Sequence, residues 1–554
     1  MPNTSFRLIR KKPFQVFLMI FFLIVASSSL KSQNVTWAIG LGSTGSDQGY
    51  DISTDSSGNV YVTGWFSGTI QIGGQTITSS GQQDIFVACF DNTGTLNWLR
   101  QAGGPSNDVS ASIVTTPSGE SYITGWFSGT CDFDDSLVVS NGNLDMFVAK
   151  YDASGTIRWV RHGGGPLDDY GNRLALSLEG GVTLAGSFKD TLDADGLQLI
   201  SLGNRDALLC HYDSVGQIAW VHGVGGAGED RAYGIIQSVD SSYFFTGMFT
   251  GNVSFGAVQL TCNSFFGTYV AALDLHGSPL WAVKADAGAN DFSRGFGIDR
   301  DLQGNVYVNG YFSGTLRIGA ATLVATGGQY DIDAFLFKLT PAGSLVWARK
   351  DGGDGTDEAQ DMCINAAGEI VSVGFFADSA RFSPFTISSA GLSDLFIARY
   401  DTAGNVIAVN GYGGTGNEYG YGITGDAVGN LFTTGVFTGS ALLGTYSFTT
   451  AGGNDAFIAA FGPSASGVQE VGSGGMFFVY PNPVHHRLYL GSRLVSGLSK
   501  DAELRITDMT GRTVLSRDMS DGATDIDVSI LTPGAYIVRW ISSGDSYACR
   551  VVVQ

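Results

Sequence analysis

Short alternating runs of apolar and polar residues dominate the chain, and they predict β-strands. Representative runs are Val60–Thr63, Ile85–Ala88 and Leu96–Trp98. β-Branched and aromatic residues favour strands, and Asp-x-x-Gly quartets such as Asp55–Gly58 and Asp91–Gly94 favour the tight turns between them. We therefore expect an all-β fold built from antiparallel hairpins.

The runs recur in register along the chain. Tryptophans mark an internal repeat of 61 residues that lengthens once to 66, and an alanine takes the last matching place: Trp37, Trp98, Trp159, Trp220, Trp281, Trp347 and Ala408. A Gly-x-Phe motif recurs in step, from Gly64/Phe66 to Gly435/Phe437. Each repeat has room for four strands, and four-stranded units arranged radially form a β-propeller. The sequence predicts a seven-bladed β-propeller over residues 33–462.

The two ends of the repeat region complement each other. The last repeat stops at Phe461, where Gly462-Pro463 replaces the expected turn, so it lacks a fourth strand. Val35–Ala38 has the sequence of a fourth strand but no repeat of its own. We expect this segment to pair with Phe457–Phe461, which would leave no open sheet edge. A linear stack of sheets is the alternative, but it does not explain the complementary ends.

The first residues have the order of a secretory signal peptide. A basic stretch, Arg7–Lys12, precedes the apolar run Val16–Ala26 and the small residues Ser27–Ser29. Eleven apolar residues are too few to span a bilayer as a helix. We expect residues 1–32 to be a cleaved signal peptide, with an uncleaved anchor as the alternative, and the mature chain to have no transmembrane segment.

The cysteines show no paired spacing and fall at different places in the repeat, so we expect them to be free. They are Cys89, Cys131, Cys210, Cys262, Cys363 and Cys549. A secreted domain of this size does not need disulfides for stability.

Composition changes after the repeats. Gly- and Ser-rich residues 463–475 indicate a linker, and residues 476–554 contain short alternating strands such as Leu504/Ile506 and Tyr536/Val538. This pattern is typical of a small Ig-like β-sandwich.

The repeats resemble the SBBP-type β-propeller repeats of secreted bacterial proteins. The resemblance rests on Asp55-Ser-Ser-Gly-Asn-Val-Tyr-Val-Thr-Gly-Trp-Phe66, followed by Asp84-Ile-Phe-Val-Ala88 and Trp98. It implies the propeller fold but no particular activity, because propellers include both enzymes and binding modules.

The C-terminal residues resemble the type A sorting domain of the type IX secretion system of Bacteroidota. The motif residues are Tyr480, Pro481, Asn482, Pro483, Gly511, Gly534 and Tyr536. The resemblance implies recognition by the outer-membrane export machinery, by way of the periplasm, and release into the medium or attachment to the outer-membrane cell surface.

Charge and motif content exclude several functions. The chain has 30 basic against 51 acidic residues, which argues against nucleic-acid binding. It contains no Gly-x-Ser-x-Gly elbow, no P-loop and no HExxH motif, so we name no catalytic residue, cofactor or metal ligand. Asp193-Ala-Asp195-Gly196 resembles part of a calcium loop without its distal Glu, which leaves calcium as an open possibility.

One acidic pattern does stand out, because an acid precedes the first strand of every repeat. We expect these carboxylates to circle one mouth of the central channel: Asp47, Asp108, Asp169, Asp230, Asp291, Asp357 and Glu418. A second ring should begin the third strands, with Gly267 as the one exception: Asp84, Asp145, Asp206, Asp333, Asp394 and Asp455. Our interpretation is that each carboxylate accepts backbone N–H groups of its turn, which would lower its pKa. The alternative is a face that binds a cation or a cationic ligand.

Departures from the repeat are the other candidates for a ligand site. They are Asp168, Arg173, Arg231, Phe265, Phe266 and Gly267. The favoured function is a secreted or surface-attached module that binds a glycan or another surface protein. The alternatives are a polysaccharide hydrolase or lyase that uses carboxylates at the channel mouth, and a structural component of a surface coat.

Overall fold

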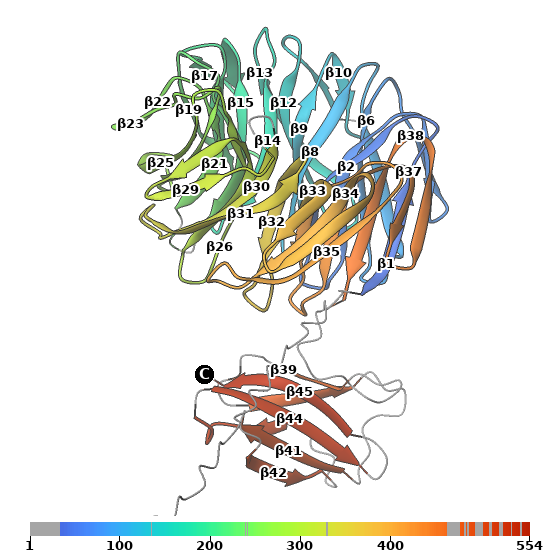
Figure 1. The fold of residues 1–554 in the computed structure, drawn as a ribbon. Coiled ribbons are helices and arrows are strands. Elements are labelled where there is room, and N and C mark those ends of the chain that lie inside the picture. The colour runs from blue at the N-terminus through green and yellow to red at the C-terminus, as the bar shows by residue number, and fades with distance from the viewer. Residues whose placement is uncertain are drawn as a thin grey trace, which may run out of the picture. The chain divides into compact units, whose positions relative to one another are not determined.

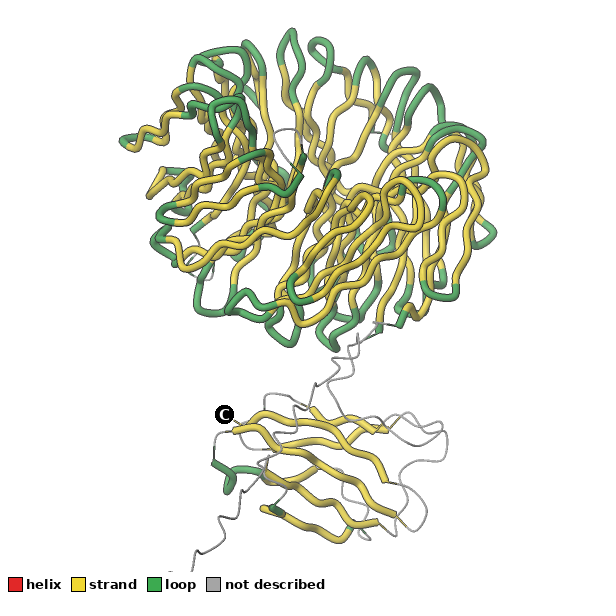
Figure 2. Tube along the Cα trace, in the orientation of Figure 1, coloured by secondary structure: helices red, strands yellow, loops and turns green. Residues whose placement is uncertain are grey.

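The computed structural model describes residues 34–462, apart from 135, 239, 241 and 328–330, and much of 477–553. In the latter range it leaves out 481–483, 485–486, 493–501, 509–511, 520–524, 533 and 543–545. The described residues form strands and no helix (Figures 1 and 2). The chain divides into two compact units, Met1–Ser464 and Ala465–Gln554. The predicted signal peptide and linker lie outside the described residues.

Seven units of four antiparallel strands make up the larger part, and we number the units in chain order. The first strands are β2 (Asp47–Thr54), β8 (Asp108–Thr115), β14 (Tyr170–Leu176), β20 (Arg231–Gln237), β26 (Ser293–Arg300), β32 (Asp357–Ile364) and β36 (Glu418–Gly425). The second strands are β3 (Val60–Phe66), β9 (Ser121–Phe127), β15 (Val182–Phe188), β21 (Tyr243–Phe249), β27 (Val306–Ser313), β33 (Ile370–Phe382) and β37 (Leu431–Leu443).

The third and fourth strands complete these units. The third strands are β6 (Asp84–Phe90), β12 (Asp145–Tyr151), β18 (Asp206–Tyr212), β24 (Gly267–Leu273), β30 (Ile332–Leu339), β34 (Phe385–Tyr400) and β38 (Tyr446–Phe461). The fourth strands are β7 (Leu96–Ala102), β13 (Ile157–Gly164), β19 (Ile218–Gly226), β25 (Pro279–Ala287), β31 (Leu345–Asp354), β35 (Val406–Gly414) and β1 (Val35–Leu41).

A short hairpin lies between the second and third strands of units one to five. The hairpins are β4 (Thr69–Ile72) with β5 (Gln75–Thr78), β10 (Thr130–Asp132) with β11 (Leu137–Val139), β16 (Thr191–Ala194) with β17 (Leu197–Ile200), β22 (Asn252–Phe255) with β23 (Val258–Thr261), and β28 (Thr315–Ile318) with β29 (Ala321–Val324). In units six and seven the corresponding residues extend the second and third strands themselves, which pair along their lengths.

The N-terminal strand completes the last unit, as the sequence predicts. β1 runs antiparallel to β38, with Trp37 opposite Ala460 and Leu41 opposite Ala456. The Gly462 N–H also donates to the Asn34 carbonyl over 3.0 Å. Figure 1 shows this blue strand beside the orange strands β37 and β38. The last sheet therefore has its fourth strand from the other end of the repeat region.

The first strands contact one another in a closed cycle. β2 contacts β8, each following first strand contacts the next, and β36 contacts β2 again. In units one to five the second and third strands are buried along nearly their whole length between neighbouring units, whereas in units six and seven their extensions are partly exposed. One apolar cluster, for example, combines Ile52 and Phe86 of unit one with Phe432 and Ile458 of unit seven. Burial of such side chains between sheets is the main source of stability in a fold of this kind.

The repeated tryptophans join neighbouring units at their outer strands. Each indole N–H donates to a backbone carbonyl in the last turn of the next unit over 3.0 to 3.3 Å. In each of these turns a glycine lies against the indole. Only glycine fits there, because a side chain would collide with the indole or, at Gly277, with the neighbouring His222. Ala408 takes the tryptophan position in unit six. The next unit, unit seven, has Gly462-Pro463 in place of the turn that would accept an indole N–H. The one alanine in the series therefore coincides with the one missing partner.

The C-terminal unit has two sheets that share one apolar core. One sheet contains β39 (Phe477–Tyr480), β40 (Arg487–Ser492) and β43 (Asp525–Asp527). The other contains β42 (Thr513–Asp518), β41 (Ala502–Asp508), β44 (Gly534–Ser542) and β45 (Ser546–Val553). Leu488, Ile506 and Val551 lie in the core between them. This core contains no residue of the repeat region.

Candidate functional site

Six of the seven predicted ring acids occupy one repeated position at the start of a first strand. They are Asp47, Asp108, Asp169, Asp230, Asp357 and Glu418, and all are buried. Each carboxylate accepts the backbone N–H of the residue four positions earlier over 2.6 to 2.8 Å. The acids therefore cap the turns between units, as the capping interpretation requires.

Asp291 does not share this position. Ser293 is the residue opposite Phe312, as Asp47 is opposite Phe66 in unit one. Asp291 lies two residues earlier, is half-buried, and accepts the Thr315 N–H over 3.1 Å. The equal spacing of the acids predicted that Asp291 belongs to the ring. The chain takes a different path before β26, so Ser293, two residues later, occupies the ring position.

The pKa shift expected for these acids has the wrong sign. Burial raises the pKa of Asp47 to about 6, of Asp108, Asp169, Asp230 and Glu418 to about 7, and of Asp357 to about 8. The backbone hydrogen bonds oppose this shift, but desolvation outweighs them. The ring is therefore buried, and its carboxyl groups have pKa values near neutral pH.

The predicted second ring begins the third strands, and it lies against the first. Asp84, Asp145, Asp206, Asp333, Asp394 and Asp455 are all buried, and Gly267 takes the place in unit four. The phenylalanine of each Gly-x-Phe motif lies between the two acid positions, as Phe66 lies between Asp47 and Asp84. Each third-strand acid approaches the first-strand acid of the next unit, and this neighbouring charge raises the pKa of Asp108, for example.

Half-buried aromatic side chains on the inner strands form a second, unpredicted feature, which we call the axial aromatic belt. Because the first strands close into a cycle, half-exposed side chains on them face the enclosed axis. Ring centroids lie 5.7 Å apart for Tyr50–Tyr421, 5.0 Å for Trp126–Tyr170, 4.9 Å for Tyr233–Phe296 and 4.3 Å for Phe375–Tyr419. The belt comprises these eight residues and Tyr311, which is buried beside Phe296.

All seven units contribute to this belt, but with different residues. The variable residue of Gly-x-Phe and the residues one and three places after the first-strand acid supply its members. That variation is the signal that could have revealed the belt in the sequence, since invariant positions such as the Trp series pack between units.

The carboxyl group of Glu358 and the guanidinium of Arg294 lie beside the belt. The Gln360 side-chain amide donates to Glu358 Oε2 over 2.7 Å, and Arg294 Nη1 donates to Tyr311 Oη over 3.2 Å. Burial raises the pKa of Glu358 to about 7, although the positive charge of Arg294 opposes the shift. Arg294 Nε is buried without a hydrogen-bond partner, and the guanidinium lies 4.5 Å from the ring of Phe266. Glu358 is therefore a carboxyl group with a near-neutral pKa among aromatic rings.

Arg173, one of the predicted departures from the repeat, bridges three units across the axis. Its Nη2 lies 2.6 Å from Asp361 Oδ1 of unit six, and its Nη1 lies 3.3 Å from Asp51 Oδ1 of unit one. Asp361 and Asp51 are buried, and the positive charge of Arg173 opposes the burial that raises the pKa of Asp51. This cluster ties opposite sides of the ring together.

The remaining departures form local contacts. Arg205 Nη2 lies 3.7 Å from Asp168 Oδ2, and Arg231 forms an ion pair with Glu229. Phe265 is exposed, whereas Phe266 is half-buried beneath Arg294. Phe266 connects to the belt through Arg294, which donates to Tyr311, and Asp168 connects to it through Arg205, which lies 4.8 Å from the ring of Tyr170.

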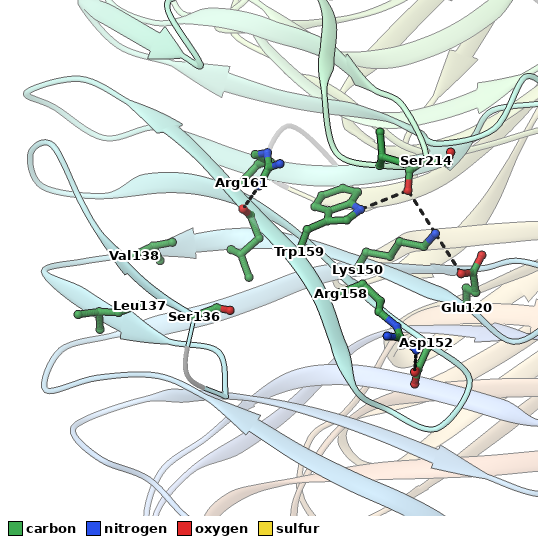
Figure 3. A pocket seen from close by; sticks show the side chains of 12 residues that line it. Glu120, Ser136, Leu137, Val138, Lys150, Asp152, Arg158, Trp159, Arg161 and Ser214 are labelled. Atoms are coloured by element: carbon green, nitrogen blue, oxygen red, sulfur yellow. Dashed lines mark hydrogen bonds and ion pairs between the residues drawn. The ribbon is translucent and has the colours of Figure 1, made fainter.

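One cavity lies on the outer strands between units two and three, away from the belt. It measures about 800 Å³ and is lined by residues that include Leu137, Lys150 and Trp159 (Figure 3). Lys150 Nζ lies 3.1 Å from Glu120 Oε1, and both Lys150 and Trp159 donate to the Ser214 carbonyl. The polar groups of the groove thus largely satisfy one another.

Cysteines and possible metal ligands add nothing to these sites. Cys89, Cys131, Cys210, Cys262 and Cys363 are free, and no described residues form a group of three or more His, Cys, Asp or Glu side chains that could hold a metal. Asp193 accepts the Gly196 N–H over 2.9 Å, which is an ordinary turn contact. Among the described residues no helix is long and apolar enough to cross a membrane.

The C-terminal motif is only partly described. Pro481, Asn482, Pro483 and Gly511 lie outside the described residues, while Tyr480 ends β39 opposite Tyr489. Gly534 begins β44 opposite Val553, and the buried Tyr536 hydroxyl donates to the Thr532 carbonyl over 2.7 Å.

Two family models match parts of the chain. Residues 478–554 match the secretion system C-terminal sorting domain, and residues 37–65 match the SBBP β-propeller repeat. The chain carries an SBBP repeat and a type IX sorting domain. The sorting domain implies recognition by the type IX machinery and export to the cell surface or medium.

Curated relatives of the propeller repeat chain are distant. An uncharacterized WD repeat-containing protein of Acanthamoeba polyphaga mimivirus is 22% identical over 475 residues, covering 67% of this chain and 34% of its own. Regulatory protein FlaEY of Caulobacter vibrioides is 26% identical over 344 residues, covering 56% and 35%. The chain thus spans about a third of the length of these relatives. A solved puromycin hydrolase has a TM-score of 0.34 and 11% identity, covering 90% of this chain and 59% of its own, and carries no argument about activity.

Proposed function

We propose that this chain is a secreted or surface-attached binding and adhesion module, in which a seven-bladed propeller recognises a glycan and an Ig-like sandwich directs export. The seven four-stranded units, the closed cycle of first strands and the β1–β38 pairing support seven blades. The two sheets around one core support the sandwich. The domain limits stay as predicted: signal peptide 1–32, propeller 33–462, linker 463–475 and sorting domain 476–554.

The axial aromatic belt is the observation that carries the binding proposal. Ligand sites combine apolar or aromatic surfaces with a few placed polar groups. Here Tyr419 and Phe375 supply aromatic faces, and Arg294, Glu358 and Gln360 supply donors and acceptors beside them. A sugar has both apolar C–H faces and hydroxyl groups, so a glycan matches this combination.

A glycan-binding array with the purified full chain, followed by titration calorimetry on any hit, tests this proposal. We expect Tyr419→Ala and Phe375→Ala to weaken binding at least about tenfold, the loss of one favourable ring contact. Leu137→Ala, in the outer groove, is the matched control and should bind normally. Binding that survives both belt substitutions would overturn the placement of the site.

A second function, cleavage of a polysaccharide, has one observation in its favour. Glu358 has a pKa raised to about 7, and a general acid or base works best when its pKa is near the working pH. Assays on polysaccharides should then show cleavage that Glu358→Gln abolishes while binding remains. Absence of cleavage by a chain that binds the same polysaccharide would leave the binding module as the function.

A further inference from the structure

Two buried carboxyl groups meet at six of the seven contacts between consecutive units. The third-strand aspartate of one unit faces the first-strand acid of the next. The pairs are Asp84–Asp108, Asp145–Asp169, Asp206–Asp230, Asp333–Asp357, Asp394–Glu418 and Asp455–Asp47. The backbone brings them together: the Asp108 N–H, for example, donates to the carbonyl of Gln83, the residue before Asp84, over 2.7 Å.

A glycine near the end of the fourth strand, or directly after it, leaves room for each pair. A side-chain carbon on Gly352 would strike both the Asp333 and Asp357 carboxyl groups, and one on Gly413 would strike both Asp394 and Glu418. The other four glycines, Gly42, Gly103, Gly164 and Gly225, would each collide with the third-strand aspartate. The two carboxyl groups are therefore packed closely, with no space for a further side chain.

One oxygen in every pair lacks a hydrogen-bond donor. Five third-strand aspartates use Oδ2 to accept the backbone N–H four residues earlier, as Asp84 does from Ser80 over 2.8 Å. Asp333 Oδ2 instead accepts the Thr326 N–H, seven residues earlier, and lies 2.6 Å from Lys350 Nζ. The Oδ1 of the third-strand aspartate is buried and has no partner in all six pairs. At two contacts this unpartnered Oδ1 lies beside an oxygen of the facing acid. A side-chain carbon on Gly352 would lie 2.4 Å from Asp333 Oδ1 and 2.8 Å from Asp357 Oδ2, and one on Gly413 would lie 2.5 Å from Asp394 Oδ1 and 2.6 Å from Glu418 Oε2. Two neighbouring acceptor oxygens without a donor between them are unfavourable unless a proton or a cation lies there.

The seventh contact, between units four and five, lacks every part of this arrangement. Gly267 replaces the third-strand aspartate, Ser293 replaces the first-strand acid, and Asp286 replaces the glycine. The Ser293 hydroxyl has both a donor and an acceptor as partners: Oγ accepts the Thr268 N–H over 2.9 Å and donates to the Ala285 carbonyl over 3.1 Å. The two acids and the glycine are thus present together or absent together within one chain, which indicates that neither acid is kept for capping alone.

We infer that each of the six carboxyl pairs holds one buried proton shared between its two carboxyl groups, so that the contacts between units are proton-binding sites. A proton needs two oxygens, which each pair supplies, whereas calcium takes six to eight oxygen ligands. Sharing a proton removes one of two adjacent negative charges, whose burial would otherwise be costly. The near-neutral pKa values of the first-strand acids agree with this, and the pair titrates as one unit.

Other charged or titratable groups face several of the pairs. They are the Cys131 thiol at Asp84–Asp108, His162 and Arg205 at Asp145–Asp169, Glu229 and Tyr269 at Asp230, Lys350 and Asp351 at Asp333, and Tyr419 at Glu418. The Asp84–Asp108 pair suits a test, because burial raises the pKa of the Cys131 thiol and keeps it neutral. The amide of Gln101, which donates to Asp84 Oδ2 over 2.6 Å, does not titrate.

Proton sharing fixes the sign of the pH dependence. In the unfolded chain both acids of a pair are ionised above pH about 5, since the ordinary Asp pKa is about 3.9. The folded chain holds the proton up to pH about 7, so it binds more protons than the unfolded chain between these limits. Stability from the pairs is therefore fully present below the unfolded pKa and is lost as pH rises through the folded pKa.

Thermal unfolding of the full chain at several pH values tests the inference. We expect the melting temperature to fall between pH about 5 and about 9. In Asp84→Asn the side-chain oxygen can stay at the Oδ2 position, where it accepts the Ser80 N–H and the Gln101 amide, and the amide N–H then takes the unpartnered Oδ1 position, where it can donate to Asp108 permanently. This variant should melt higher than the natural chain at pH about 8 and show a smaller pH slope. Asp84→Ala should melt lower at every pH, and Asp291→Asn, at the contact without a pair, should leave the slope unchanged.

A second measurement keeps the inference testable if Asp84→Asn does not fold. Asp394→Asn makes the same change in the pair with Glu418, and infrared spectra of the natural chain should contain bands of protonated carboxyl groups at pH about 6 that disappear at high pH. A melting temperature that does not fall with pH, or an Asn variant as unstable as the Ala variant at pH about 8, would overturn it. A rise in melting temperature with calcium, reversed by chelator, would show that a cation and not a proton joins the pairs.

Discussion

Arg173 Nη2 donates to Asp361 Oδ1 over 2.6 Å although the two residues are 188 positions apart in the chain. The contact connects unit three with unit six, and the second guanidinium nitrogen reaches Asp51 of unit one. Most other contacts of the first strands join consecutive units. This cluster is therefore a direct bond between distant parts of the ring.

Arg173→Met should destabilise the propeller by roughly 3 kcal/mol, because it leaves Asp51 and Asp361 buried without their cation. Urea unfolding followed by circular dichroism would measure the change. Arg158→Met is the control, since the Arg158 side chain is 57% exposed in its ion pair with Asp152, and it should cost less than about 1 kcal/mol. Equal effects of the two substitutions would contradict a structural role for the axial cluster.

The tryptophan contacts between units should contribute mainly through packing. Trp98→Ala should cost about 3–5 kcal/mol, because it removes a buried ring from beneath Gly155. Trp98→Phe keeps most of the ring and loses the hydrogen bond to the Ala153 carbonyl, so it should cost about 1–3 kcal/mol. Ala408→Trp should bring no gain in melting temperature, because the turn that would accept its indole N–H is absent.

Deletion of residues 476–554 should leave a folded repeat region that is not exported. The C-terminal unit has its own core, so the melting temperature of the remaining chain should stay within a few degrees of that of the full chain. In a bacterium with a type IX system the truncated chain should accumulate in the periplasm. Its normal appearance at the cell surface, detected with antibody on intact cells, would contradict the sorting role.

Arg294→Ala should raise the pKa of Glu358 further above its ordinary value. The positive charge of Arg294 opposes the effect of burial on this carboxyl group, and its loss removes that opposition. Carbon-13 NMR of labelled glutamate side chains would follow the titration, with Lys284→Ala, whose partner is Asp286, as the control. A lower pKa in Arg294→Ala would mean that water enters and rehydrates Glu358.

The repeat made much of the architecture predictable. The matching place of Trp37 in the series led to its pairing opposite Ala460, since strand position follows directly from register in a repeat. The same use of register gave one wrong prediction. Equal spacing assigned Asp291 to the first-strand acid position of unit five, but Ser293 occupies that position. The expected fall in carboxyl pKa was wrong because the sequence shows the hydrogen-bonding turn but not the depth of burial.

Contacts that do not follow the repeat could not be predicted. Arg173 stood out in the sequence, but its partners Asp51 and Asp361 lie across the axis, and no spacing along the chain identifies them. The sequence showed only part of the carboxyl-pair pattern. Gly267 was recognised as the exception in the third-strand series, but Ser293, the matching exception in the first-strand series, was missed because Asp291 was assigned to its position. The axial aromatic belt comes from positions that vary between units, which a search for recurrence passes over.

The hydrogen bond from Gly462 to Asn34 brings the two ends of the repeat region side by side. A short linker could therefore join them, and new ends could be opened in the exposed turn of any other unit without breaking a sheet. The order in which the seven units are translated is then not fixed by the ring itself. Strand β1, however, is translated long before its partner β38, so it stays unpaired and the ring stays open until the seventh unit has been synthesised.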